Sequence, residues 1–253
     1  MNAATDDLLS ADRALVGAVA KGDAAAAASF IDAEFTWIDA HGRAGKRVGK
    51  PLLGDESGLS PIVHRYEQAA SVVAERSKLF VLRLWIKRAA GWRCLVWHEV
   101  SQELPAAPHV PTRRDHDNPA RVIPYEPRDQ HERDALASWQ RLEQAVIAHD
   151  AETWANHVAD EFLVLGPTRR HTKADRKAVI EEQKRKDTPS APSPLIWAKL
   201  HGVKDAMVMR CQHQPFHGKA AQVSRLFIKR DGRWLMAASA QTTEQDAPIK
   251  TID

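Results

Sequence analysis

Three polar side chains in the first half of the chain could act together on a substrate proton. Asp39 follows a short apolar run, Tyr66 lies in an alternating stretch and His98 stands in the apolar stretch 92–101. A carboxylate and an imidazole can shuttle a proton, and a phenol can donate a hydrogen bond to a developing oxyanion. Asp39 and His98 each also have a structural interpretation, since Asp39 precedes His-Gly as a turn residue does and His98 could be a satisfied core group. Asp39, His98 and Tyr66 are the candidate catalytic residues.

Aromatic and basic residues on the predicted strands are candidates for contacting a ligand. Trp37, His64 and Trp85 would line a pocket in the first half. Arg83 and Arg225 each stand two residues before an aromatic side chain, where a guanidinium fork could hold a ligand carboxylate. The alternative is that each arginine packs over its aromatic neighbour for structural reasons alone.

Strand alternation over 92–101 predicts which of these side chains share a face. One face, expected to be buried, carries Trp92, Cys94, Val96, His98 and Val100. The opposite face carries Arg93, Trp97 and Glu99. His98 would therefore stand at the mouth of an apolar face.

The sequence holds no complete motif for a metal or a nucleotide cofactor. Cys211, His213 and His217 form the densest group of metal-ligating residue types, but no carboxylate lies among them and the segment has the composition of a hairpin rim. Glycine-rich phosphate loops and the GxSxG and HExxH motifs are absent from the sequence. We expect neither a metal nor a cofactor.

The charge balance and apolar content exclude several partner classes. The 253 residues carry 36 Lys and Arg against 33 Asp and Glu, a formal net charge of +3. This excess is too small for a nucleic-acid footprint, and the basic stretch from Arg169 to Lys186 alternates with acidic residues as a solvated face does. No apolar run reaches the ~18 residues that span a membrane, and the Ala-rich start carries too many charges for a secretory signal. Cys94 and Cys211 are expected in the core, and the protein is expected in the cytoplasm without a nucleic-acid or membrane partner.

An internal repeat determines the predicted organisation of the chain. Residues 14–53 align without a gap over 141–180, and residues 83–92 align over 225–234 with both arginines and both final tryptophans matched. Between the copies, prolines exclude a helix or a central strand. We predict a first domain at 1–104, a Pro-rich linker at 105–130 and a second domain at 131–253.

Each copy is expected to begin with helices and to continue as a sheet. Apolar spacing predicts two successive helices per copy, with Ser10, Asp23 and Asp150 as capping residues. A short strand at 35–39 or 162–165 and a third helix at 46–53 or 173–186 follow. Period-two runs predict four further strands per copy, at 61–68, 71–76, 79–88 and 92–101 and at 195–203, 206–213, 221–230 and 234–243. The result is an α+β domain of about three helices packed on a curved, mostly antiparallel sheet.

Four segments carry a resemblance to a known family. The segments GDAAAAASFIDAEFTWID (22–39) and HDAETWANHVADEFLVL (149–165) and the closing hairpins WIKRAAGWRCLVWHEVS (85–101) and FIKRDGRWLMAASAQTT (227–243) are similar to those of the nuclear-transport-factor-2-like (NTF2-like) superfamily, with its SnoaL-like and ketosteroid-isomerase-like branches. The resemblance covers about 12–103 and 134–244 and implies two tandem cone-shaped domains. Because family members commonly dimerise through their sheets, it also implies that the two copies pack as an intramolecular pseudo-dimer.

The resemblance permits two classes of function, since this superfamily holds enzymes, binding proteins and association domains. The first is a protein that binds a small, partly apolar ligand or serves as an association module, with its site in the first domain and a mainly structural second domain. The alternative is a cofactor-independent isomerase, cyclase or dehydratase that abstracts a proton next to a carbonyl in the first domain. Because the sequence reveals no buried carboxylate pair, binding ranks first.

Overall fold

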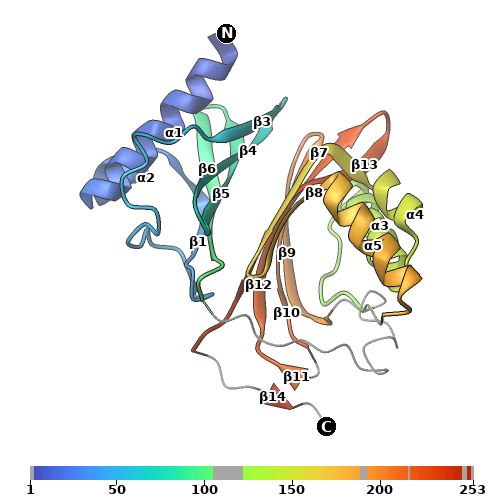
Figure 1. Ribbon diagram of the computed structural model, residues 1–253. Helices are drawn as coiled ribbons and strands as arrows, with labels where there is room; N and C mark the ends of the chain where they lie inside the picture. The colour runs from blue at the N-terminus through green and yellow to red at the C-terminus, as the bar shows by residue number, and fades with distance from the viewer. Residues whose placement is uncertain (1–2, 105–121, 189–192, 216, 247–249, 252–253) are drawn as a thin grey trace.

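The computed structural model describes residues 3–104, 122–188, 193–215, 217–246 and 250–251. Within them the chain forms two tandem α+β domains, each a six-stranded sheet with helices on one face (Figure 1). Residues 105–121 of the predicted linker lie outside the described residues. The predicted boundaries at 104 and 131 therefore stay predictions.

The first domain contains two helices and one sheet. Its elements are α1 (Ala3–Lys21), α2 (Ala24–Ala28), β1 (Ile31–Ile38), β2 (Ala44–Gly45), β3 (Ile62–Tyr66), β4 (Ala69–Arg76), β5 (Leu79–Arg88) and β6 (Gly91–Ser101). The strand order is β2-β1-β6-β5-β4-β3, with β1 parallel to β6 and the other neighbours antiparallel. Gly22 follows α1 with φ 69°, a left-handed backbone that glycine adopts without strain, and Asp23 accepts the backbone N–H of Ala26. The predicted cap at Asp23 is confirmed, whereas Ser10 lies inside α1 rather than at its start.

The second domain repeats this plan with one more helix. Its elements are α3 (Gln130–Ile147), α4 (Ala151–Asn156), β7 (Val158–Gly166), β8 (Arg169–Thr172), α5 (Lys173–Arg185), β9 (Leu195–Val203), β10 (Ala206–His213), β12 (Ala221–Arg230) and β13 (Arg233–Thr243). The strand order is β8-β7-β13-β12-β10-β9, and the short β11 (His217–Gly218) and β14 (Lys250–Thr251) pair separately. Asp150 caps α4 by accepting the backbone N–H of Thr153, as the repeat predicts.

A third helix is present in the second domain and missing from the described first domain. Helix α5 begins with a capping box in which Thr172 and Asp175 satisfy each other's backbone N–H groups. Residues 46–53 belong instead to the loop from β2 to β3, which contains Gly49, Pro51 and Gly54. Because glycine and proline disfavour the helix interior, the prediction of a helix at 46–53 is wrong.

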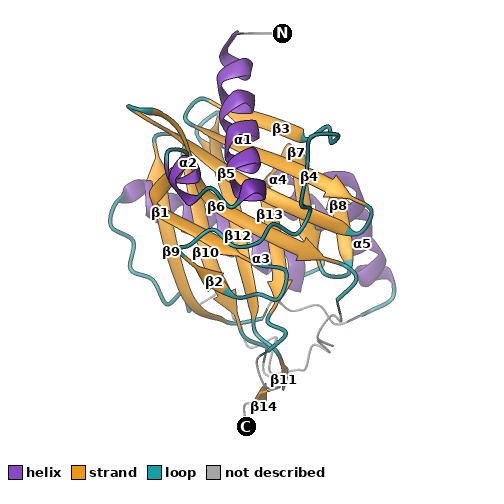
Figure 2. Cartoon of the chain, turned by 90° about the vertical axis from the view of Figure 1, so that its left-hand side faces the viewer, coloured by secondary structure: helices purple, strands orange, loops and turns teal. Residues whose placement is uncertain are grey.

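The two sheets pack face to face, and the helices lie on the outer faces (Figures 1 and 2). One buried apolar cluster joins the sheets and includes Leu82, Val96 and Val100 of the first with Val208, Leu226 and Ala240 of the second. Its burial is the main force that holds the two sheets together. At the edge of this contact Arg170 pairs with Glu75 at 2.8 Å, and the backbone N–H of Gln245 donates to the carbonyl of His41 at 2.9 Å.

A β-bulge in β6 changes which of its side chains face the helices. The register against β5 shifts between the pairs Leu84↔Val96 and Trp85↔Cys94. An extra residue in a strand reverses the alternation beyond it. Val96 and Val100 therefore join the contact between the sheets, while Trp97 lies with Trp92 and Cys94 on the helix side. The alternation predicted for 92–101 is wrong beyond Cys94, and His98 does not share a face with Trp92.

Candidate functional site

Tryptophans fill the space between α1–α2 and the first sheet, called here the first interior. Trp37, Trp85, Trp92 and Trp97 are all buried there. The rings of Trp37 and Trp97 stack with their centroids 4.7 Å apart and their planes 8° apart. Large aromatic side chains contribute much of the apolar contact in a core, and these four leave the first interior well packed.

Two carboxylates of the chain hold Arg83 inside this first interior. Its Nε and Nη2 donate to the two oxygens of Asp12 at 2.7 and 3.0 Å, and its Nη1 and Nη2 donate to those of Glu56 at 2.9 and 3.0 Å. Burial by itself would lower the pKa of Arg83, but the two carboxylates raise it above its usual value. The guanidinium of Arg83, which the sequence suggests could hold a ligand carboxylate, is thus already bonded to Asp12 and Glu56.

Asp39, a predicted catalytic residue, stands in the turn after β1. Its Oδ1 accepts the backbone N–H groups of His41 and Arg43 at 2.9 Å, and its Oδ2 accepts Nε of Arg43 at 2.7 Å. These hydrogen bonds fit the interpretation of Asp39 as a turn residue that bonds its own backbone. The turn packs on the segment after β13, where a Cβ at Gly42 would come within 2.8 Å of the Glu244 backbone.

Tyr66 and His64 lie on β3, at the sheet edge opposite β2 and therefore far from Asp39 in the strand order. Tyr66 packs against the cluster between the sheets. Burial, and next the negative charge of Glu161, raise the pKa of Tyr66 above its ordinary value. His64 pairs across the sheet with Ser71 and shares the face of Tyr66 because the two are two residues apart on a strand.

His98 lies between the two sheets. Its Nδ1 is 2.9 Å from Oγ of Ser224 and its Nε2 is 3.1 Å from Oγ1 of Thr242, both in the second domain. The Thr242 hydroxyl donates its single hydrogen to the carbonyl of Glu99 at 2.6 Å, so it accepts from Nε2 of His98 and Ser224 donates to Nδ1. Burial, and next the charge of Arg210, lower the pKa of His98 to about 3, in keeping with a neutral ring.

The structure therefore gathers part of the predicted site and separates the rest. Trp37, Arg83 and Trp85 meet in the first interior. Asp39, Tyr66 and His98 lie at three different places, and His64 lies on the face that looks away from α1. The catalytic and ligand-binding roles of all these residues stay predictions.

The space between α3–α5 and the second sheet, called here the second interior, has different side chains at matching positions. In the first sheet one row of cross-strand neighbours runs through Gly45, Trp37, Trp97, Arg83 and Val72. The matching row in the second sheet runs through His171, Val164, Ser239, Arg225 and Met209. A valine and a serine thus replace two stacked tryptophans beside the equivalent arginine. Ser239 is 1% exposed and its Oγ has no hydrogen-bond partner.

Among the residues that the structure describes, no carboxylate lies at hydrogen-bond distance from Arg225. Its Nη1 donates to Sγ of Cys211 at 2.9 Å, its Nη2 donates to Nε2 of His213 at 3.0 Å, and Oε1 of Glu143 is 3.6 Å from Nη2. His213 donates from Nδ1 to the carbonyl of Ser193 at 2.7 Å, which leaves Nε2 as an acceptor. Burial, and next the charge of Arg225, lower the pKa of His213 to about 3.

Two further arginines turn inward around Glu143. Arg169 lies over Gly166, where a Cβ would come within 3.3 Å of its Cγ, and its Nη2 donates to Gln241 at 2.9 Å while its Nε has no partner. Arg176 stands one helical turn before the buried Ile180 on α5, so the two share a face. Burial, and next the charge of Arg169, lower the pKa of Arg176 to about 10. We call Arg169, Arg176 and Arg225 the arginine cluster.

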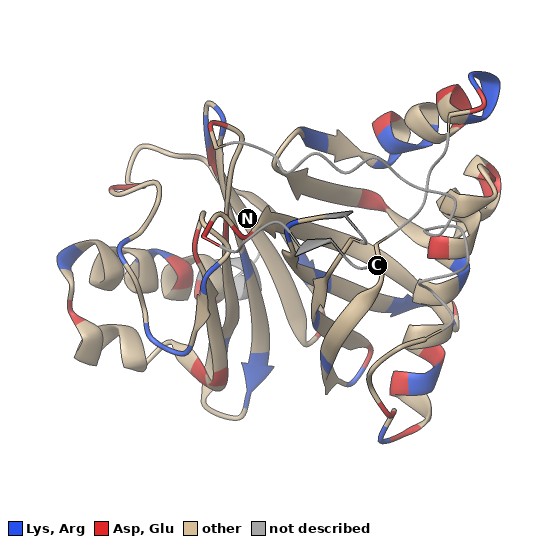
Figure 3. Ribbon diagram, turned by 90° about the horizontal axis from the view of Figure 1, so that it is seen from below, with Lys and Arg blue, Asp and Glu red and all other residues tan. Residues whose placement is uncertain are grey.

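The sequence predicts that the charged side chains of the basic stretch 169–186 face water, and this holds for only part of the stretch. Lys177 pairs with Glu152 at 2.5 Å, and Arg185 and Lys186 both pair with Glu182. Basic and acidic residues alternate in this way along the outer helices (Figure 3). For Arg169 and Arg176 the interpretation is wrong, because both side chains reach the second interior and act on the pKa of Glu143.

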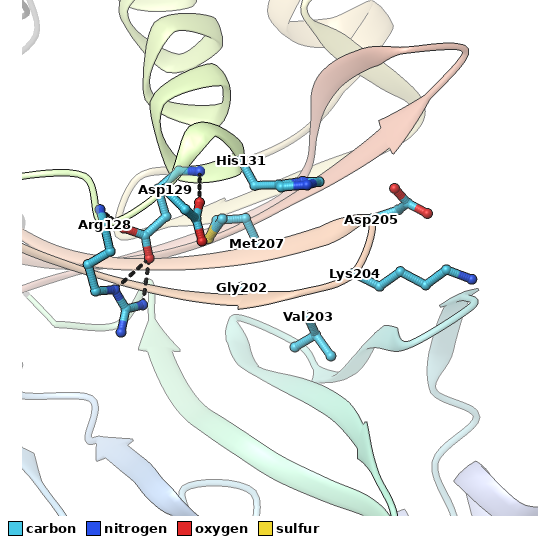
Figure 4. A pocket seen from close by; sticks show the side chains of 9 residues that line it. Arg128, Asp129, His131, Gly202, Val203, Lys204, Asp205 and Met207 are labelled. Atoms are coloured by element: carbon cyan, nitrogen blue, oxygen red, sulfur yellow. Dashed lines mark hydrogen bonds and ion pairs between the residues drawn. The ribbon is translucent and has the colours of Figure 1, made fainter.

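An open pocket of about 530 Å³ lies outside both interiors, between the start of α3 and the turn from β9 to β10 (Figure 4). Its cations are already paired, Arg128 with Glu132 at 2.5 Å and Lys204 with Glu67 of the first domain. Among the described side chains that line it, none has a buried polar atom without a partner. The pocket therefore offers a ligand fewer unmet contacts than the second interior.

Neither a metal cluster nor a membrane helix is found in the described part of the chain. No group of three or more His, Cys, Asp or Glu there could hold a metal ion, and the side chain of His217 lies outside the described residues. None of the helices there is long and apolar enough to cross a membrane. Cys94 and Cys211 are free and buried, as predicted.

Sequence reasoning missed Glu143, Arg169, Arg176 and Ser239 as candidate site residues. One signal was available for Ser239, because the aligned closing hairpins set it against Trp97. Glu143 and the two arginines carry no local signal, since charged residues on a helix or at a strand edge usually face water. Their inward direction depends on where the helices pack.

Comparison with known proteins adds information on the fold. No protein-family model and no curated protein matches the sequence. A protein of unknown function with a cystatin-like fold from Nostoc punctiforme is 15% identical with a TM-score of 0.38 and covers 46% of this chain and 93% of its own. An NTF2-like protein from Cytophaga hutchinsonii is 18% identical with a TM-score of 0.37, covering 46% and 98%. A putative calcium/calmodulin dependent protein kinase II association domain from Xanthomonas campestris is 14% identical with a TM-score of 0.39, covering 50% and 97%.

Each of these solved structures covers about half of this chain. Similarity at this level of identity concerns the fold and not the activity. The order of the predicted helices and strands is found in each domain, apart from the missing helix at 46–53, and the short strands β2, β8, β11 and β14 are additions that the sequence did not predict. The chain has two tandem α+β domains, and the solved structures similar to it include proteins described as NTF2-like or as having a cystatin-like fold.

Proposed function

We propose that the protein binds a small molecule in the second interior, with the first domain as a structural partner in an intramolecular pseudo-dimer. One observation carries this proposal: beside equivalent arginines, the first sheet has Trp37 and Trp97 where the second has Val164 and Ser239. The exchange removes two of the four tryptophans that pack the first interior. The tryptophans of the second interior stand outside this row of the sheet, and the Trp139 ring centroid lies 5.9 Å from Cζ of Arg225. The exchange leaves small side chains where a ligand could lie against the sheet.

Unmet hydrogen-bonding groups in the second domain support the same interpretation. Ser239 Oγ, His171 Nδ1, Arg169 Nε and Gln183 Oε1 are buried and have no hydrogen-bond partner within the described part of the chain. A buried polar atom without a partner costs roughly 1–3 kcal/mol, so groups of this kind are expected to meet a ligand or water. Arg169 and His171 stand on β8, Ser239 on β13 and Gln183 on α5.

This proposal moves the site from the first domain, where the sequence suggested it, to the second. In the first interior the donors of Arg83 are engaged with Asp12 and Glu56, and the stacked tryptophans occupy the remaining space. The second domain, expected to be mainly structural, becomes the binding domain.

Proton abstraction in the first domain has weaker support than binding. Asp12 and Glu56 are both bonded to Arg83. Glu99 is a further buried carboxyl, and burial raises its pKa to about 7, but its Oε1 already accepts the backbone N–H of Leu52 at 2.8 Å and Nε1 of Trp97 at 3.2 Å. These carboxyl groups serve contacts within the chain, which favours a binding protein over an isomerase.

A thermal-shift experiment tests the proposed site. The compounds are indole, benzamide, benzoate, phthalate and phenyl phosphate, and the proteins are the wild type, Ser239→Trp and Ser239→Ala. A ligand that binds only the folded state at about 100 times its Kd stabilises it by about 2.7 kcal/mol. We expect at least one compound to raise the Tm of the wild type and of Ser239→Ala but not of Ser239→Trp.

The control separates filling of the site from loss of the hydroxyl, because Ser239→Ala leaves the space open. If Ser239→Trp does not fold, Ser239→Leu takes its place. A wild-type protein whose Tm rises with none of the compounds, neutral or anionic, would overturn the proposal. Equal shifts in the wild type and Ser239→Trp would overturn the location.

A further inference from the structure

We infer that the ligand of the second interior is a small organic anion, held by the arginine cluster and Ser239. This inference rests on the proposed function and adds the chemical class of the ligand. A carboxylate or a phosphate group on a partly apolar body has the required chemistry.

The charges around the second interior do not balance within the described residues. The guanidinium groups of Arg169, Arg176 and Arg225 all act on one carboxylate, that of Glu143. Glu143 is 8% exposed and is also the acceptor of Nε1 of Trp139 at 3.1 Å. No ion pair joins Arg169 or Arg176 to a carboxylate in the described part of the chain, and the pair of Arg225 with Glu143 spans 3.6 Å. The set carries an excess of positive charge.

The first interior shows the opposite arrangement at the equivalent position. Arg83 alone meets the two carboxylates of Asp12 and Glu56, with four hydrogen bonds between 2.7 and 3.0 Å. The repeat therefore preserved the arginine in both domains, with two directly bonded carboxylates in the first and one carboxylate at 3.6 Å in the second. In the second domain the Nη atoms of Arg225 are bonded to Cys211 and His213, so neutral partners stand where Arg83 has carboxylates.

Arg225 is buried and Arg169 and Arg176 are half-buried, and a cation that loses water without gaining a counter-ion is costly because the protein interior solvates charge poorly. Burial lowers the pKa of Arg169, and the charge of Arg169 then adds to burial in lowering the pKa of Arg176. A negatively charged ligand would offset the repulsion between the arginines and would replace the solvation that they lose. A neutral ligand would do neither.

The donors and the walls around the cluster specify the ligand further. Arg169 Nε and Ser239 Oγ lack partners, and guanidinium forks match the paired oxygens of carboxylates and phosphates. Trp139, Phe162 and Met209 are buried in the same core cluster and provide apolar surface. These groups together suit a compact molecule with a negatively charged end and an apolar or aromatic body.

Isothermal titration of the full chain tests the charge of the ligand. Benzamide, benzoate, phthalate and phenyl phosphate share an aromatic ring and differ in charge, and the last two separate a carboxylate from a phosphate ligand. We expect the wild type to bind phthalate or phenyl phosphate at least tenfold more tightly than benzamide. Arg176→Met is expected to weaken the tighter of these two at least tenfold, and Arg176→Lys to keep part of the affinity.

Arg185→Met is the matched control, because Arg185 lies on the same helix and pairs with Glu182 at the surface. Its affinity should equal that of the wild type. Without ligand, Arg176→Met should have a Tm equal to or above that of the wild type, since the variant removes a half-buried cation that has no ion pair among the described residues. A merely structural arginine would instead lower the Tm of the free protein.

Two results would overturn the inference. Binding of benzamide as tightly as benzoate and phthalate would retain the proposed function and refute the anionic class. Arg176→Met and Arg185→Met with the same affinity for the anions would refute the role of the cluster. Absence of binding by all compounds, the neutral one included, is the distinct result that refutes the proposed function itself.

Discussion

Arg83 and Arg225 stand at equivalent positions of the two sheets, yet Arg83 is bonded to two carboxylates and Arg225 to a thiol and an imidazole. The two arginines are 1% and 4% exposed, so each is a buried cation. Asp12 comes from α1 and Glu56 from the loop between β2 and β3, and only the first domain has them. The duplicated domains thus differ most in how each neutralises the same buried charge.

Replacing Arg83 by methionine should destabilise the protein strongly. The variant leaves the carboxylates of Asp12 and Glu56 buried without a counter-ion, a situation that costs about 3–5 kcal/mol. Urea unfolding at neutral pH measures the loss. The triple variant Arg83→Met, Asp12→Leu, Glu56→Leu should recover most of it, because an apolar set of similar volume needs no charge balance. A loss below about 1 kcal/mol for the single variant would contradict the ion-pair assignment.

Replacing Trp97 by serine, the residue type at the equivalent position 239 of the second sheet, should show how the first interior is packed. Trp97→Ser removes a buried ring that stacks on Trp37 and should cost about 3–5 kcal/mol in the free energy of unfolding. Ser239→Ala is the matched change in the second sheet and should be nearly neutral, because its hydroxyl has no partner. Urea unfolding of both variants provides the comparison, and equal losses would show that the two interiors are packed alike.

The contact between the sheets should depend on residues that are buried only in the paired arrangement. Leu226 is 0% exposed in the cluster that joins the sheets, whereas Ile196 on β9 is 46% exposed. Leu226→Ala should lower the free energy of unfolding by about 2–5 kcal/mol. Ile196→Ala should change it by less than about 1 kcal/mol, because the side chain is already in contact with water. Similar losses for the two variants would argue against the packing of one sheet on the other.

His98 should make the stability depend on pH. Its pKa is about 3 in the folded chain against a usual value of 6.5, so between these values the unfolded chain binds a proton that the folded chain does not. Its contribution to the free energy of unfolding is fully present above about pH 6.5 and is lost as the pH falls toward 3. The loss is roughly 2 kcal/mol at about pH 5. His213 acts in the same direction and window. Glu99 acts in the opposite direction, since its raised pKa of about 7 makes its contribution fall as the pH rises through the range from 4.5 to 7.

Urea unfolding at about pH 7.5 and about pH 5 isolates the His98 contribution when the wild type is compared with His98→Gln. The glutamine keeps a donor and an acceptor for Ser224 and Thr242 but does not titrate in this range. The wild type should lose about 2 kcal/mol more than the variant between the two pH values. The same loss in both proteins would mean that His98 is protonated in the folded chain.

The amino-acid sequence by itself determined the tandem organisation, the caps at Asp23 and Asp150 and nearly all of the strands. These features are local or repeated: a cap needs one side-chain oxygen near the first turn, and alternation is legible within a single strand. The repeat added evidence because each copy supports the assignment of the other. The helix at 46–53 failed for an equally local reason, since Gly49, Pro51 and Gly54 interrupt the segment.

Only the tertiary structure decided where the candidate site lies. The bulge after Cys94 sent His98 into the contact between the sheets and Trp97 into the first interior, and alternation within one strand cannot reveal an added residue that depends on the neighbouring strand. Arg83 is neutralised by a glutamate from a distant loop. Arg176 faces inward because α5 packs on the second sheet through Ile180, and the direction of Arg169 is set by the pairing of β8 with β7. The charge of a buried site is a sum over segments far apart in the sequence, so it exists only once these segments are folded together.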